Sequence, residues 1–164
     1  MNELVNIRAE AASLAADLGP KLCGMSEDDA LKASIAALSE AGLLAWTVPA
    51  AHGGAATELC GAETVSVRAL SAVRDELAYE HGVLDLAFIM QGLGSFPIAL
   101  SGNEALAAEV LPKVAAGECV KPGTFMLEFL ATKCNLTREV WSGIMSAVID
   151  RAVGRLNESG AQSA

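Results

Sequence analysis

Residues 83–100 constrain this chain more than any other stretch, because their only charged side chain is Asp85. A segment that is apolar on every side has to be buried in protein or in lipid, since each Å² of apolar surface left in water costs about 25 cal/mol. Burial in protein is favoured, because Gln91, Ser95 and Pro97 interrupt the run and its immediate flanks carry no lysine or arginine anchor. The stretch therefore predicts a central core helix around which the other elements pack.

The composition indicates helices packed on helices. Hydrophobic residues make up 52% of the 164 residues but aromatic residues only 4%, so the core has to be built from aliphatic side chains. Alanine, leucine and glutamate have high helix propensity, and no segment shows the sustained apolar and polar alternation of a half-exposed strand. The sequence predicts an all-α protein of about six helices.

The net charge of −9 excludes some classes of partner. It repels phosphate backbones and anionic lipids, so neither nucleic acid nor a membrane is predicted to bind. The first residues lack the basic start and apolar core of a secretory signal, which predicts a cytoplasmic protein. The cysteines show no Cys-x-x-Cys spacing and are interpreted as small buried thiols, with a disulfide or a zinc site as the alternative. They are Cys23, Cys60, Cys119 and Cys134.

The spacing of apolar residues places the helices and their ends. Gly19 and Pro20 are expected to end the first helix, and Ser26 is expected to cap the second. Pro97 is expected to kink the central helix, because proline lacks an N–H and clashes with the carbonyl four residues earlier. The expected helices cover about residues 3–18, 26–41, 60–79, 83–100, 104–115 and 135–157.

Several motifs occur in an order that resembles the N-terminal helical domain of the acyl-CoA dehydrogenases. The resemblance covers roughly residues 31–118 and, more loosely, the first helix. It implies an all-α orthogonal helical domain of that type over residues 1–118, followed by a divergent helical extension over 119–164 that packs on it. The motifs are LSEAGLLAWTVPAAHGG at 38–54, DELA at 75–78, LGSFPI at 93–98, SGN at 101–103 and VLPKVAAGE at 110–118.

The resemblance also implies a substrate and a set of residues that contact it. Members of the family are flavoproteins that oxidise acyl-CoA thioesters to trans-2-enoyl-CoA, and their central helix forms one wall of the pocket for the acyl tail. Gly92 and Gly94 would make room for that tail. Plain core packing explains the same residues equally well. By position, the substrate-binding wall residues would be Asp85, Leu86, Ile89, Met90 and Leu93.

The chain departs from the family after Glu118. No family-like threonine-glutamate-proline strand follows, and the 164 residues contain neither the β-domain that holds much of the flavin nor the helical bundle that supplies the catalytic glutamate. No catalytic residue is therefore predicted, because Glu128, Glu139 and Asp150 lie in no recognisable family context. Residues 135–157 instead repeat apolar side chains on one helical face, at Val140, Ile144, Val148, Ala152 and Leu156.

Two functions from different classes follow. In the first, the chain lends an acyl-pocket wall to flavin-dependent α,β-dehydrogenation of acyl thioesters, with FAD bound only through a partner flavoprotein subunit, and is inactive alone. In the second, it is a non-catalytic helical interaction module, or a homo-oligomer, that keeps the packing of the domain. A truncated relic of such an enzyme is a further alternative, and it would expose apolar patches.

Overall fold

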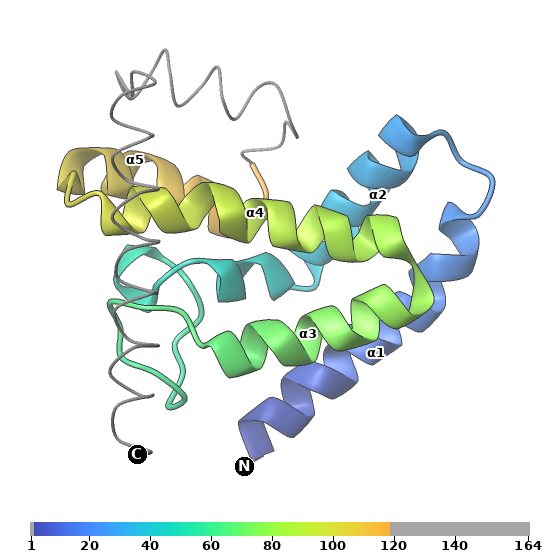
Figure 1. Cartoon of the computed structure of the whole chain (residues 1–164), viewed down its shortest axis with the longest axis horizontal. Coiled ribbons are helices and arrows are strands. Elements are labelled where there is room, and N and C mark those ends of the chain that lie inside the picture. Colours follow the sequence, from blue (N-terminus) through green and yellow to red (C-terminus); the bar gives the residue numbers. More distant parts are fainter. Residues whose placement is uncertain (1, 119–164) are drawn as a thin grey trace, which may run out of the picture. The chain divides into compact units, whose positions relative to one another are not determined.

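The computed structural model describes residues 2–118, which form helices and loops and contain no strand (Figure 1). This confirms the predicted all-α class for the part of the chain that the structure describes. The sixth predicted helix, at 135–157, and the extension at 119–164 lie outside these residues. Five α-helices and two short 3-10 helices are present: α1 (Asn2–Leu22), α2 (Glu27–Glu40), η1 (Leu43–Thr47), η2 (Ala50–His52), α3 (Val67–Glu80), α4 (Gly82–Leu100) and α5 (Glu104–Ala115).

Helix α4 is the central element, as the sequence predicts. It contacts α2, α3, α5 and η1, while α1 packs along α3 (Figure 1). The side of α4 that meets these elements is its inner face, and it includes Phe88, the one aromatic residue among the buried hydrophobic residues that the structure describes. The remaining buried hydrophobic side chains are aliphatic, which agrees with the low aromatic content. The buried residues of α4 are Leu84, Ala87, Phe88, Gln91, Gly94, Ser95 and Ile98.

Helix α1 continues past the predicted stop. Gly19 and Pro20 lie inside the helix, which ends at Leu22. A proline inside a helix costs about 3 kcal/mol, but here the extra turn buries Leu22, which is only 2% exposed. It also brings Gly19 against the end of α3, where a Cβ atom on Gly19 would lie 3.3 Å from the Cβ of Glu80. Tertiary packing therefore keeps the chain helical through the proline. Helix α4 likewise continues through Pro97 to Leu100.

Helix caps fix three of the helix starts. The hydroxyl of Ser26 accepts a hydrogen bond from the Asp29 N–H at 3.2 Å, as predicted, and the side chain of Asn103 accepts one from the Leu106 N–H at 3.1 Å. Helix α3 begins at Val67 rather than near residue 60, because Ser66 caps it by accepting from the Ala69 N–H at 3.3 Å. The predicted start of α3 was wrong.

The connector between α2 and α3 is packed closely against itself. The N–H of Gly54 donates to the Pro49 carbonyl at 3.1 Å. A Cβ atom on Gly54 would lie 1.7 Å from the carbonyl oxygen of Val48, so no other residue fits there without moving the backbone. The same connector supports α4, because the hydroxyl of Ser95 donates to the Thr47 carbonyl at 2.8 Å. The connector thus fixes the inner face of α4.

Candidate functional site on the outer face of helix α4

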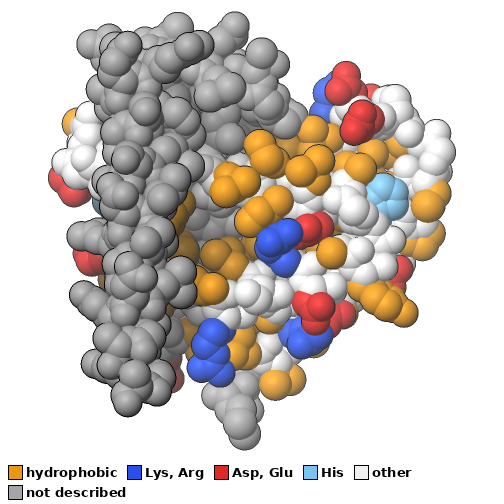
Figure 2. All heavy atoms as spheres, viewed as in Figure 1, with side chains coloured by type: hydrophobic (Ala, Val, Ile, Leu, Met, Phe, Trp, Pro, Cys, Tyr) orange, Lys and Arg blue, Asp and Glu red, His pale blue; other side chains and the backbone are white. Residues whose placement is uncertain are grey.

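Helix α4 has an apolar outer face that the other described helices leave open. Leu86, Leu93 and Leu100 are seven residues apart, so at about 100° per residue they fall on nearly one line along the helix. Their exposed fractions are 44%, 56% and 50%. Phe96 lies beside this line and is 37% exposed. Figure 2 shows hydrophobic side chains gathered over α4.

This open face corrects the expectation that residues 83–100 are buried on all sides. The described neighbours of α4 cover its inner face alone, so apolar side chains on the opposite side stay in contact with solvent. Fully burying a leucine is worth about 1.5–3 kcal/mol relative to leaving it exposed. An exposed line of three leucines is therefore a surface that favours contact with an apolar ligand or partner.

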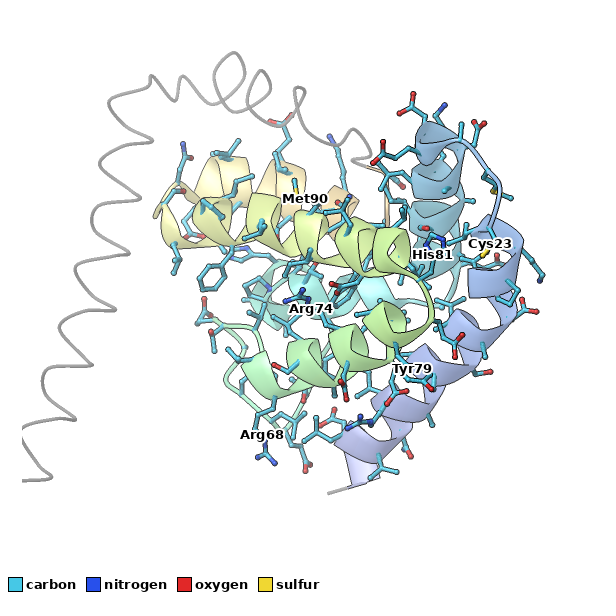
Figure 3. All side chains as sticks on the ribbon, turned by 45° about the vertical axis from the view of Figure 1, so that its right-hand side comes forward. Cys23, Arg68, Arg74, Tyr79, His81 and Met90 are labelled. Carbon is cyan, nitrogen blue, oxygen red and sulfur yellow. The ribbon has the colours of Figure 1, made fainter. Side chains whose placement is uncertain are left out.

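The structure brings four of the five predicted wall residues onto the outer face. Leu86 and Leu93 are exposed, and Ile89 and Met90 are partly buried beside them. Figure 3 shows Met90 on α4. These positions are three and four residues apart, which is the spacing of neighbours on one side of a helix. Their contact with an acyl tail stays a prediction.

The two glycines proposed to make room for the tail lie elsewhere on α4. Gly94 is on the buried inner face, so its missing side chain leaves no space on the outer face. A Cβ atom on Gly92 would lie 3.8 Å from the Cβ of Thr47, an ordinary contact distance toward η1. The helical period separates these positions from Leu86 and Leu93, and the role of the two glycines beside an acyl tail stays a prediction.

The fifth predicted wall residue, Asp85, is held by an arginine from α3. Its carboxylate accepts hydrogen bonds from Nε and Nη2 of Arg74, both at 2.8 Å. Figure 3 shows Arg74 reaching from α3 toward α4. The Asp85 hydrogen bond raises the pKa of Arg74 above its ordinary value. Such a bidentate pair is among the stronger protein hydrogen bonds. Asp85 therefore lies at the edge of the outer face with its carboxylate already paired.

The outer face of α4 does not fit a flavin dinucleotide by itself. A pyrophosphate needs clustered backbone N–H groups or cations, whereas this face presents carbon atoms and one ion pair that is already satisfied. No group of three His, Cys, Asp or Glu side chains among residues 2–118 could hold a metal ion. The chemistry of the face is therefore that of an apolar wall.

Helix α4 is also long and apolar enough to cross a membrane, judged by length and composition alone. The contacts of its inner face indicate a core helix instead. Ser95 is fully buried and bonded to η1, and Asp85 is paired with α3. A membrane span would have to break these contacts between helices or carry its partners into lipid.

Comparison with known families gives one match. The model of the acyl-CoA dehydrogenase N-terminal domain matches residues 2–118. The matched residues are those in which the five described helices lie, α4 and its outer face included. No curated protein matches the chain.

Proposed function

Because the chain belongs to the acyl-CoA dehydrogenase family through its N-terminal helical domain, we propose that it supplies one wall of an acyl pocket. The reaction is flavin-dependent α,β-dehydrogenation of an acyl thioester, carried out with a partner chain. That partner supplies FAD and the catalytic base, and this chain alone is inactive. Residues 1–118 form the family-type domain in this proposal, and 119–164 are a divergent helical extension.

The observation that carries the proposal is the open outer face of α4. Leu86 and Leu93 are exposed there, and Ile89 and Met90 lie partly buried beside them. An acyl tail forms no hydrogen bonds, so its site has to be a continuous apolar surface that excludes water. Met90 suits a tail of variable shape, because its unbranched side chain adapts easily.

The rest of the domain holds this wall in place. The Arg74–Asp85 pair joins α4 to α3 near the start of the face, and the Ser95 hydroxyl joins it to η1 near the middle. Two anchors on one helix limit its rotation, so the outer residues keep one orientation toward a ligand. The chain's own contribution is thus to bind and orient the tail.

The proposal is tested by tagging the chain, purifying its complex from the native host and measuring acyl-thioester-dependent reduction of an electron acceptor. We expect Leu93→Asp to lower this activity at least about tenfold, since a charge on the wall is poorly solvated in an apolar pocket. The matched control is Val5→Asp on α1, because Val5 is 63% exposed and lies off α4. Equal activity of the two variants would overturn the assignment of the wall.

A second candidate function is a non-catalytic helical interaction module. The seven-residue spacing of Leu86, Leu93 and Leu100 favours it, because this is the spacing at which one helix packs along another. In that case the purified chain is colourless, has no acyl-dependent activity, and changes its oligomeric state when Leu93→Asp is introduced. Sedimentation of the wild type and the variant separates this candidate from the first.

A further inference from the structure

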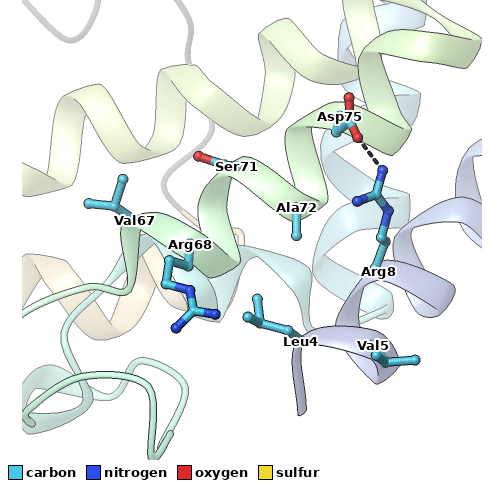
Figure 4. A pocket seen from close by; sticks show the side chains of 8 residues that line it. All are labelled: Leu4, Val5, Arg8, Val67, Arg68, Ser71, Ala72 and Asp75. Carbon is cyan, nitrogen blue, oxygen red and sulfur yellow. Dashed lines mark hydrogen bonds and ion pairs between the residues drawn. The ribbon is translucent and has the colours of Figure 1, made fainter. Parts of the chain in front are cut away.

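A second apolar surface lies between α1 and α3, away from the outer face of α4. It is a groove of about 640 Å³ whose walls include Leu4 and Val5 from α1 and Val67 and Ala72 from α3 (Figure 4). Val5 and Val67 are 63% and 71% exposed, so the rim of this groove presents apolar side chains to solvent. The volume is within the range of small-ligand sites.

The two arginines of the groove differ in how their charges are compensated. Arg8 pairs with Asp75 and Glu76 of α3, and these partners raise its pKa above the ordinary value. Arg68, by contrast, forms no ion pair with any residue that the structure describes, and Figure 4 shows it beside Leu4. The groove therefore combines an apolar wall with one arginine that makes no ion pair of its own among the described residues, while Arg8 is held by two carboxylates.

We propose that this groove binds a free single-chain fatty carboxylate, with the tail along Leu4, Val5 and Ala72 and the carboxylate on Arg68. A guanidinium matches a carboxylate with two parallel hydrogen bonds. The hydroxyl of Ser71, one turn from Arg68 on the same face of α3, can donate another. The ligand is a free molecule and not a bilayer, because the many head groups of an anionic bilayer would meet the chain's net charge of −9, whereas a single carboxylate meets Arg68 alone.

This site is separate from the proposed wall on α4, since α1 and α3 alone line it. Its occupation does not require a flavoprotein partner. A failure to find such a partner would leave the groove unaffected, and a failure of the groove to bind would leave the pocket wall unaffected.

The test is calorimetric titration of the purified full chain with dodecanoate below its micellar concentration. We expect Arg68→Gln to weaken binding about tenfold or more, because a charge-assisted pair is lost. The matched control is Lys32→Gln, which removes the same charge from an exposed site on α2 and should bind like the wild type. Dodecanol, which has the tail without the charge, should bind the wild type about as weakly as dodecanoate binds Arg68→Gln.

Two further variants assign the site of the tail. Val67→Asp should abolish binding without unfolding the protein, because Val67 is the exposed first residue of α3, where a carboxylate favours the helix. Met25→Asp, which places the same charge on an exposed apolar residue outside the groove and outside α4, should leave dodecanoate binding unchanged. No binding to the wild type, equal binding to Arg68→Gln, or loss of binding in Met25→Asp would each overturn the proposal.

Discussion

The guanidinium of Arg74 and the carboxylate of Asp85 join α3 to α4 through two hydrogen bonds of 2.8 Å each. The Asp85 side chain is 15% exposed and the Arg74 side chain 43% exposed, so the pair is only partly screened by water. It neutralises the one charge of residues 83–100. Helix α4 can therefore pack its inner face on the protein without carrying an unpaired carboxylate at its edge.

Breaking this pair should destabilise the fold. We expect Asp85→Asn to lower the free energy of unfolding by about 1–2 kcal/mol, the range for charge-assisted hydrogen bonds discounted for the exposure of Arg74. Urea unfolding measures the change. Adding Arg74→Gln to Asp85→Asn should cost little more, and fully additive losses would show that the two side chains do not act as a pair.

The same pair predicts a flat alkaline pH dependence. The folded-state pKa of Arg74 is raised, so its contribution to stability is present below the unfolded pKa and is lost only as the pH rises through the folded value. Both values lie above the working range. The difference in unfolding free energy between wild type and Arg74→Gln should stay constant between about pH 7 and pH 10, and a steady decline over that interval would contradict the assignment.

Gly54 should be among the least replaceable residues of the domain. Its Cβ position lies 1.7 Å from the Val48 carbonyl oxygen, so Gly54→Ala has to move the connector and should cost more than about 3 kcal/mol. Gly61→Ala is the matched control, because nothing lies within 4 Å of that Cβ position. Thermal unfolding should show a large loss for the first variant and little change for the second.

The two faces of α4 should respond differently to truncation. Leu84 is fully buried and Leu93 is 56% exposed. We therefore expect Leu84→Ala to cost about 2–5 kcal/mol and Leu93→Ala less than about 1 kcal/mol. Denaturant unfolding of the isolated chain measures both. Similar losses at the two positions would mean that the outer face is already covered in the isolated chain.

The hydroxyl of Ser95 offers a test of how η1 supports α4. Ser95 is fully buried and donates to the Thr47 carbonyl. Ser95→Ala leaves that carbonyl without its partner and should cost about 1–2 kcal/mol. The exposed Ser13 of α1 is the control, since Ser13→Ala gains helix propensity and should be neutral or slightly stabilising. A neutral Ser95→Ala would mean that η1 does not hold α4.

Local signals in the sequence predicted most of the described fold. The cap formed by Ser26 before three acidic residues and the apolar spacing of the helices both depend on residues only a few positions apart. The five described helices are the ones expected. The signals that misled were also local. Pro20 is tolerated because Leu22 packs in the core, and the cap of α3 is Ser66, which lies inside the range that was expected to be helical.

The candidate site was harder to predict, because it depends on which elements cover which face. Periodicity groups Leu86 with Leu93 but cannot show that no described helix covers them. The Arg74–Asp85 pair forms only because the corner between α3 and α4 brings positions eleven residues apart together. Gly94 was assigned to the pocket from its order in a motif, and the helical period places it on the buried face.

The proposed function requires a partner that covers the outer face of α4 and brings the flavin. The most direct measurement is the visible absorption spectrum of the tagged chain purified gently from its native host, with every co-purifying polypeptide identified by mass. We predict a flavin band together with a second, larger polypeptide, and loss of both in Leu93→Asp. A colourless preparation containing this chain alone would contradict the proposed function.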